Sequence, residues 1–157
     1  MLRDYMRKPG SKEKNTQKTC RFCEIIKKKE DMIFEDNIVF VMINQSPYKE
    51  GHILILPKRH VVDLRELNPE ESESLFKKIS FMLGVLEDTY ETKSFNIGCN
   101  ICPPAGSTYE HLHFQIIPRW VGDSGFMEVF ADTRVMKESP QKTKERIIES
   151  IKSLNKK

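Results

Sequence analysis

The fold is decided by one stretch, FNIGCNICPPAGSTYEHLHFQIIPRW, which occupies residues 95–120. Polar and apolar side chains alternate along its residues 111–117. Successive side chains of a β-strand point to opposite faces of the sheet, so this alternation predicts a half-buried strand. One face is expected to be apolar, and the other is expected to carry two imidazoles and an amide. The apolar residues are Leu112, Phe114 and Ile116, and the polar ones are His111, His113 and Gln115.

The residues just before this strand predict a loop. Two glycines and two prolines within residues 98–106 exclude a long helix there. Such a loop can direct backbone N–H groups toward a phosphate, together with the hydroxyl groups of Ser107 and Thr108. Two strand histidines also fit a purely structural role in hydrogen bonding, so from these residues alone that alternative stays open.

The chain before this stretch predicts three strands and a long helix. Residues 33–43 are typical of two short strands joined at residues 35–37, and residues 52–57 of a third strand. Asn68 and Pro69 are typical of a helix start. Apolar residues then recur at three- and four-residue spacings and are expected in the core; they are Leu75, Phe76, Ile79, Met82, Leu83 and Leu86.

A second helix is predicted near the C-terminus. It starts at Ser139 and Pro140 and carries an apolar face of Ile147, Ile148, Ile151 and Leu154. Hairpins without regular βαβ alternation predict an α+β fold, with an antiparallel sheet of about five strands, one long helix and this C-terminal helix. Residues 1–18 are polar and lack periodicity, so we expect a flexible basic leader before a single domain over residues 19–157.

Length and charge narrow the class of protein. A chain of 157 residues is typical of one domain with a proper core. No apolar run approaches the length of a membrane span, and the N-terminus lacks the apolar core of a signal peptide, so we expect a cytoplasmic protein without a membrane partner. Residues 1–19 and 137–157 each carry a net charge of +4, whereas the residues between them carry −5. That distribution argues against a broad nucleic-acid groove.

Several separated segments resemble the histidine triad (HIT) superfamily of nucleotide hydrolases and transferases. In order, they are Asn100, Ala105-Gly106-Ser107-Thr108, His111-x-His113-x-Gln115 and Pro118-Arg119-Trp120. The superfamily has a third histidine where this chain has Gln115. Glutamine there resembles the transferase branch, which includes diadenosine tetraphosphate phosphorylases and galactose-1-phosphate uridylyltransferase. The resemblance runs from about Cys20 to about Met136, and it implies the same α+β fold and a homodimer whose sheets continue across a two-fold axis.

The four cysteines form two Cys-x-x-Cys pairs, Cys20/Cys23 and Cys99/Cys102. In a cytosolic protein this spacing predicts metal or redox chemistry more than disulfides. Structural zinc takes four Cys or His ligands, and zinc is the metal we expect. The resemblance to zinc-bearing members implies that the ligands are Cys20, Cys23, His60 and His111. Two alternatives are a four-cysteine site and a metal-free pair of buried thiols at Cys20 and Cys23.

The triad residues predict the chemistry. Imidazole is an uncharged nucleophile at neutral pH and leaves phosphorus readily. The resemblance makes His113 the nucleophile, which would form a nucleotidyl-histidine intermediate. Gln115 cannot act as a general acid, but it can donate an amide N–H to a phosphate oxygen. The expected substrate is therefore a dinucleoside polyphosphate, and the favoured reaction is phosphorolysis of diadenosine tetraphosphate to ADP and ATP.

The remaining site residues follow from the resemblance by position. It implies that ribose or phosphates are held by Asn44, Asn100, Ser107 and Thr108, and that a base, expected to be adenine, enters an apolar pocket of Phe22, Ile25 and Met42. Asparagines in turns and apolar residues in cores also explain these positions. Two alternative functions are hydrolysis of nucleoside phosphoramidates or dinucleotides with release of AMP, and nucleotide binding without turnover.

Overall fold

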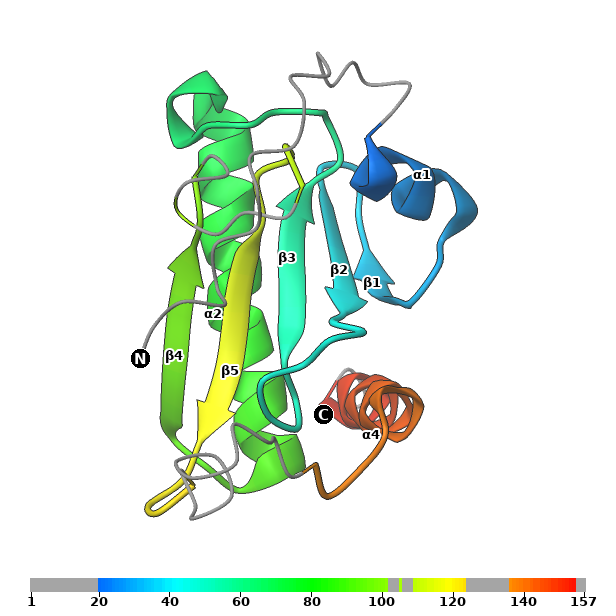
Figure 1. Ribbon diagram of the computed structural model, residues 1–157, viewed down its shortest axis with the longest axis vertical. Helices are drawn as coiled ribbons and strands as arrows, with labels where there is room; N and C mark the ends of the chain where they lie inside the picture. The colour runs from blue at the N-terminus through cyan, green and yellow to red at the C-terminus, as the bar shows by residue number, and fades with distance from the viewer. Residues whose placement is uncertain (1–19, 102–104, 106–108, 124–135, 155–157) are drawn as a thin grey trace, which may run out of the picture.

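The computed structural model describes residues 20–101, 105, 109–123 and 136–154. Its centre is a five-stranded antiparallel sheet with the order β1-β2-β3-β5-β4 (Figure 1). The strands are β1 (Met32–Glu35), β2 (Val39–Ile43), β3 (Ile53–Pro57), β4 (Ser94–Cys99) and β5 (Phe114–Arg119). The helices are α1 (Arg21–Lys28), the short 3₁₀ helix η1 (Leu64–Glu66), α2 (Pro69–Tyr90) and α4 (Pro140–Leu154). The α+β prediction is confirmed, while the leader, Cys102, Ser107 and Thr108 lie outside the described residues.

The hairpin of β1 and β2 forms where the sequence predicts it. The Asp36 carboxylate accepts hydrogen bonds from the backbone N–H groups of Ile38, at 2.9 Å, and Val39, at 2.7 Å. An aspartate that bonds its own following backbone stabilises a turn, so the reversal is encoded locally. Strand β2 then pairs with β3 from Val39↔Pro57 to Ile43↔Ile53.

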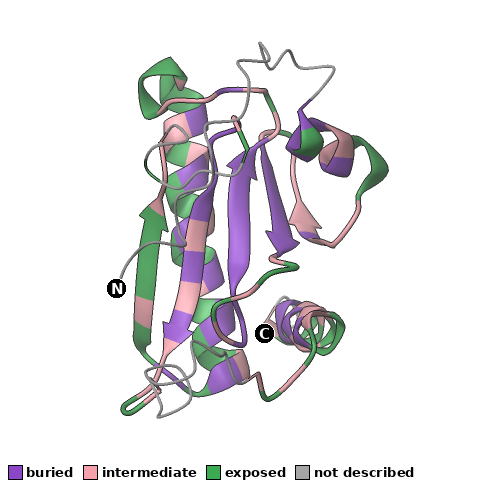
Figure 2. Cartoon of the chain, in the orientation of Figure 1, coloured by how far each residue is buried: buried purple, intermediate pink, exposed green. Residues whose placement is uncertain are grey.

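The two central strands are buried on both faces, as the purple arrows of Figure 2 show. One face packs on α2 and α4 in a large cluster that includes Val41, Ile55 and Leu86. The opposite face packs on α1 in a smaller cluster of Cys20, Phe22, Cys23, Ile25, Phe40, Met42, Leu54 and Leu56. The sheet is therefore the middle layer, and the two faces of each strand serve different clusters.

Helix α2 begins with a complete capping box. The Asn68 side chain accepts from the Glu71 N–H at 2.8 Å, and the Glu71 carboxylate accepts from the Asn68 N–H at 3.0 Å. Pro69 occupies the first helical turn, where its missing N–H costs nothing. The predicted helix start is thus confirmed, and α2 extends over 22 residues to Tyr90.

The prediction that Phe76 is a core residue is wrong. Its side chain is 64% exposed, and that of Phe81 is 36% exposed. Seven residues of α2 are buried, and the buried stripe runs through Leu75, Ile79, Met82 and Leu86. Phe76 follows Leu75 directly, about 100° farther around the helix, so it lies at the margin of the stripe, where its ring contacts that of Phe114.

The strand predicted for residues 111–117 starts later than expected. Strand β5 begins at Phe114, so His111 and His113 lie in the segment that leads into it. The predicted burial of Leu112, Phe114 and Ile116 is confirmed. The two histidines are buried as well, because α1 covers the face on which an open front was expected.

Helix α4 attaches to the C-terminal part of α2 through a carboxylate. Glu138 accepts hydrogen bonds from the Tyr90 hydroxyl at 2.6 Å and the Thr143 hydroxyl at 2.7 Å, and it pairs with Arg146 at 2.9 Å. The predicted C-terminal helix is confirmed, with Ile147 and Ile151 in the core. Among the helices of the described residues, none combines the length and the apolar character that crossing a membrane requires.

Candidate metal centre and active site

Four side chains from three separate segments meet beside α1. Cys20 and Cys23 lie at the N-terminus of α1, His60 follows β3, and His111 precedes β5; their ligand atoms all lie within 4.8 Å of one another. The Cys20 Sγ lies 3.5 Å from the His111 Nδ1, and the Cys23 Sγ lies 3.5 Å from the His60 Nδ1 and 3.6 Å from the His111 Nδ1.

These separations fit a tetrahedral ion. Zn–S and Zn–N bonds of about 2.3 and 2.05 Å at the tetrahedral angle place sulfur and nitrogen about 3.6 Å apart. The donor set, two thiols and two imidazoles, is also one that structural zinc sites use. The donor atoms of the cluster and three of their separations therefore match those of a tetrahedral zinc site. Cys99, half-buried at the end of β4, is not part of the cluster.

The orientation of His111 is fixed by a backbone carbonyl. Its Nε2 lies 2.9 Å from the Pro57 oxygen, which selects the tautomer with the proton on Nε2 and directs the Nδ1 lone pair at the cysteines. Burial lowers the pKa of His111 to about 4, so the ring is neutral at pH 7, as a metal ligand must be. The N–H of Leu112 also donates to the Val61 oxygen at 2.7 Å.

Without a metal the cysteines are buried thiols. Burial, together with the neighbouring Cys20, raises the pKa of Cys23 to about 12. A bound cation reverses this, because a coordinating thiol is deprotonated outright. Both residues lie in the first turn of α1, where the helix dipole also favours a thiolate. Cys20 and Cys23 are three residues apart, which places both sulfur atoms on one side of the helix start.

The ring of His113 is oriented by the residue two positions before it. Its Nδ1 donates to the His111 carbonyl oxygen at 2.8 Å, so its Nε2 carries the free lone pair. Burial lowers the pKa of His113 below its ordinary value, although the hydrogen bond to His111 works against this. The ring is thus neutral at pH 7 and held in one tautomer. The backbone that positions it also carries the metal-ligand candidate His111.

An apolar cluster lies beside His113, and Gln115 is on the same face of the sheet. The Phe22 ring lies 5.0 Å from the His113 ring and 5.0 Å from that of Tyr109, measured between centroids. Phe22, Ile25 and Met42 are buried together in the cluster under α1. This position is compatible with both predicted roles, core residues and an apolar base pocket. Gln115 pairs with Leu54 and Gly98 in the sheet, and its side chain is on the same face as this cluster.

The two asparagines that were predicted to hold ribose or phosphates lie at opposite ends of the sheet. Asn100 directly follows Cys99, the partner of Phe114, so Asn100 and His113 leave the β4–β5 ladder at the same end. Asn44 lies at the other end of the same face, about 13 Å away along the strand direction. Its Oδ1 accepts from the Ser46 N–H at 2.9 Å, which is the turn chemistry that its sequence also allowed. Ser107 and Thr108 lie outside the described residues.

Sequence reasoning missed three features of the site. The carbonyls of Pro57 and His111 fix the two imidazoles, and no sequence pattern marks which carbonyl accepts a particular bond. Tyr109 packs edge-on to Phe22 and keeps 39% of its surface exposed. An aromatic residue two positions before the first triad histidine is the signal that would have found it.

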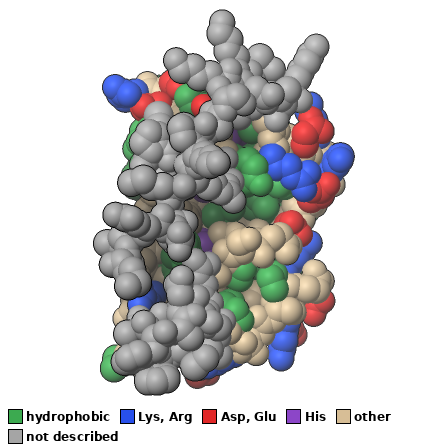
Figure 3. Space-filling model, in the orientation of Figure 1, with side chains coloured by type: hydrophobic (Ala, Val, Ile, Leu, Met, Phe, Trp, Pro, Cys, Tyr) green, Lys and Arg blue, Asp and Glu red, His purple; other side chains and the backbone are tan. Residues whose placement is uncertain are grey.

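The surface charge near α1 is mixed. Arg21 pairs with Glu30 at 2.9 Å, and Lys27 lies 3.6 Å from Glu24. Figure 3 shows Lys/Arg and Asp/Glu side chains side by side along this edge of the molecule. This arrangement differs from the single-sign basic stripe that marks a nucleic-acid interface.

Known proteins resemble this chain in sequence. Over 106 residues it is 31% identical to a protein named AP-4-A phosphorylase from Mycobacterium tuberculosis, covering 67% of this chain and 54% of the relative. Over 92 residues it is 32% identical to bis(5'-nucleosyl)-tetraphosphatase (asymmetrical) from Schizosaccharomyces pombe, covering 59% of this chain and 50% of the relative. The chain thus spans about half the length of these relatives.

Solved structures share the fold. A hypothetical histidine triad nucleotide-binding protein from Sulfolobus tokodaii has a TM-score of 0.72 and 27% identity, covering 87% of this chain and 94% of that one. A zinc-bound histidine triad family protein from Mycobacterium smegmatis has a TM-score of 0.74 and 23% identity, covering 90% and 99%, and it supports the fold alone. The HIT domain itself matches residues 26–121, more than half of the chain. Sequence and fold agree that the chain belongs to the HIT family.

Proposed function

We propose that the protein is a nucleotidyltransferase that cleaves dinucleoside polyphosphates through a covalent nucleotidyl-His113 intermediate. Its favoured reaction is phosphorolysis of diadenosine tetraphosphate to ADP and ATP. The names of the relatives support the substrate class, since they act on diadenosine or dinucleoside polyphosphates. Adenine is the expected base for the same reason.

One observation carries the proposal, the hydrogen bond from the His113 Nδ1 to the His111 carbonyl. It leaves the His113 Nε2 unprotonated, and burial lowers the pKa of His113, so the nucleophile is ready without a separate base. The Phe22 ring of the apolar cluster lies 5.0 Å from the His113 ring, and the Gln115 side chain is on the same face of the sheet as that cluster.

The reaction consists of two displacements. In the first, the His113 Nε2 attacks the α-phosphorus of diadenosine tetraphosphate, the N–P bond forms, and the bridging P–O bond breaks with ATP as the leaving group. In the second, an oxygen of inorganic phosphate attacks the same phosphorus, the N–P bond breaks, and ADP leaves. The electron pair of the broken N–P bond returns to the imidazole.

Gln115 favours transfer in this scheme. Its amide can donate to a non-bridging phosphate oxygen, where negative charge gathers in the transition state. It has no proton to give to a leaving group, so it suits a polyphosphate, which leaves as a stable anion. We therefore expect phosphate to compete well with water for the intermediate.

Product analysis with and without inorganic phosphate tests the reaction. The protein is incubated with diadenosine tetraphosphate, and nucleotides are separated by chromatography. Phosphate-dependent formation of ADP and ATP supports the proposal. Formation of AMP and ATP regardless of phosphate identifies a hydrolase instead, and binding without turnover identifies a nucleotide-binding module. His113→Ala is the matched control and should abolish turnover while circular dichroism stays unchanged.

We propose that Cys20, Cys23, His60 and His111 bind structural zinc. Sulfur and nitrogen separations of 3.5 to 3.6 Å support this assignment. With four protein ligands zinc has no open position for water, so it supplies rigidity to the segment before His113 and takes no part in the displacement. Metal analysis of the purified protein should find about one zinc per chain, and Cys23→Ser should reduce that content. The ligand thiols must stay reduced, which suits the cytoplasm.

We further propose a homodimer joined along β4. Among the described strands this one pairs with β5 alone, and Ile97 on it is 47% exposed. An edge strand presents unpaired backbone N–H and C=O groups that a second copy can pair with. The exposed Phe76 ring, which touches Phe114 of β5, would be covered at the same time. Analytical ultracentrifugation should give a dimer for the native chain and a monomer for Ile97→Lys; a native monomer would refute this assembly.

A further inference from the structure

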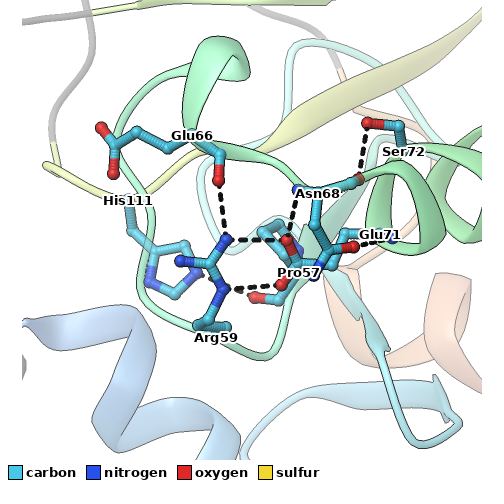
Figure 4. A network of polar contacts seen from close by, with 7 residues as sticks. All are labelled: Pro57, Arg59, Glu66, Asn68, Glu71, Ser72 and His111. Carbon is cyan, nitrogen blue, oxygen red and sulfur yellow. Dashed lines mark hydrogen bonds and ion pairs between the residues drawn. The ribbon is translucent and has the colours of Figure 1, made fainter.

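Arg59 and Glu71 form a bidentate ion pair outside the proposed catalytic machinery. The Arg59 Nε donates to one Glu71 oxygen at 2.7 Å, and its Nη2 donates to the other at 2.7 Å. The same Nη2 also donates to the Glu66 carbonyl at 2.8 Å (Figure 4). The Glu71 side chain is only 8% exposed, whereas that of Arg59 is 50% exposed. Fork-to-fork pairing of this kind fixes direction as well as distance.

The pair joins two elements that are separate in the chain. Glu71 already belongs to the capping box that starts α2, since its carboxylate accepts from the Asn68 N–H. Arg59 lies in the segment that follows β3. The ion pair therefore attaches residues 57–61 to the rigid first turn of the longest helix.

Residues 57–61 include one of the four metal-ligand candidates and contact a second. The Pro57 oxygen accepts from the His111 Nε2, and the Val61 oxygen accepts from the Leu112 N–H, so the segment contacts the His111 region at two points. It also contains His60, next to Arg59. Figure 4 shows Arg59 two residues after Pro57, whose oxygen contacts His111 from another segment.

His60 depends on this segment more than His111 does. Within the described part of the chain, the His60 Nε2 has no hydrogen-bond partner, whereas the His111 Nε2 has the Pro57 carbonyl. Its ring contacts the edge of the His111 ring at 5.2 Å, but that contact does not set the direction of a lone pair. The orientation of His60 therefore follows from the backbone conformation of residues 57–61.

We propose that the Arg59–Glu71 ion pair is the positioning element of the metal centre, and that it sets the place of His60 and, through Pro57, of His111. The inference rests on the metal site proposed above. Partners that orient metal ligands from outside the coordination sphere typically change metal affinity 10- to 100-fold when removed, so an effect of about that size is expected. Arg59 and Glu71 are positioning residues and touch no substrate.

The rival interpretation is that the pair only stabilises the fold. The chain offers a matched control for it, the Arg146–Glu138 pair. There too a half-exposed arginine, 41%, meets a buried glutamate, 7%, and also donates to a backbone carbonyl, that of Thr89 at 2.6 Å. The two side chains attach the start of α4 to α2 through Thr89 and Tyr90, and neither belongs to the metal cluster.

The test compares zinc binding in variants of the two pairs. Arg59→Met and Arg146→Met are studied in the full chain by competition with a chromophoric chelator, by the absorption spectrum of the cobalt-substituted protein, and by urea unfolding. We expect Arg59→Met to weaken zinc binding about 10- to 100-fold and to alter the cobalt spectrum. Arg146→Met should keep zinc affinity within about twofold, even where its loss of stability is similar.

A second pair of variants covers a folding failure of Arg59→Met. Glu71→Gln keeps the capping box, because glutamine serves at that position too, and removes only the charge; Glu138→Gln is its control. Equal zinc affinities in the Arg59/Glu71 and Arg146/Glu138 variants would overturn the inference and leave the zinc site standing. A native chain that binds no zinc would overturn the zinc site itself, and this inference with it.

Discussion

Truncation of Ile25 distinguishes the two roles predicted for the apolar residues under α1. Ile25 is 6% exposed and lies in the small cluster beside Phe22 and Met42. Ile79 of α2 is also 6% exposed, but it lies in the large cluster on the opposite face of the sheet. The substitutions Ile25→Ala and Ile79→Ala therefore remove the same atoms from two helical side chains that are equally buried. Only the first lies in the cluster of Phe22, whose ring contacts that of His113.

The expected loss of stability is similar for both. Each substitution removes three carbon groups, worth about 0.8 kcal/mol each when buried, or about 2.3 kcal/mol at this burial. The cavity left behind adds to this, so each variant should lose about 3 kcal/mol of unfolding free energy. If Ile25 also lines the base pocket, Ile25→Ala should lose a further contact with the substrate of about 1–2 kcal/mol, or about 5- to 30-fold in kcat/KM.

The assay measures kcat/KM for diadenosine tetraphosphate in both variants, at a temperature where urea unfolding shows each to be fully folded. Zinc is supplied at a saturating concentration, so that loss of metal from the Cys20/Cys23 end of α1 does not contribute to the difference. We expect a large drop for Ile25→Ala and almost none for Ile79→Ala. Equal kcat/KM values in the two variants would refute the base-pocket role and leave Ile25 as a core residue.

Three further predictions follow from the site and the fold. Because burial lowers the pKa of His113 below that of a free imidazole, the pH at which kcat/KM has fallen by half should lie below about 6.5, and half-loss at or above pH 6.5 contradicts the reasoning. Gly51→Ala should cost about 2–4 kcal/mol, because φ is +76° and a Cβ would lie 2.7 Å from Pro118 and from Tyr90. Gly122→Ala, with φ of +72° and no atom of the described residues within 4 Å of a Cβ, should cost only about 1–2 kcal/mol, so equal losses in urea unfolding exclude the steric contribution. Zinc removal by a chelator should lower Tm by about 10 °C or more while most far-ultraviolet dichroism remains, and an unchanged Tm after verified removal contradicts a structural metal.

Local elements of the fold were predictable because neighbouring residues make them. Asn68, Pro69 and Glu71 form a helix start among themselves, and Asp36 turns the chain with its own following N–H groups. The burial of Leu112, Phe114 and Ile116 also followed from their alternation. The prediction for Phe76 was wrong because residue spacing gives only the centre of the buried stripe on a helix. How many residues beside that centre are buried depends on the surface against which the helix packs.

The site was predictable as a set of residues and not as an arrangement. The type and spacing of Cys20, Cys23, His60 and His111 indicated metal ligands, and the structure brings these four together. Their distances depend on three segments that meet only after β3 and β5 pair. The sequence pattern could not predict the late start of β5. Histidines at alternate positions indicate a strand whether or not their backbone groups pair with a neighbouring strand.

The sequence by itself determined the elements, the α+β class, the family and the chemical types available at the site. Only the tertiary structure decided which groups hold the two imidazoles: the carbonyls of Pro57 and His111 select their tautomers, and Arg59 reaches across to Glu71. The physical reason is that every residue carries the same carbonyl and N–H groups. Which of them bonds to a particular side chain is set by distances between segments far apart in the chain, and those distances exist only in the packed fold.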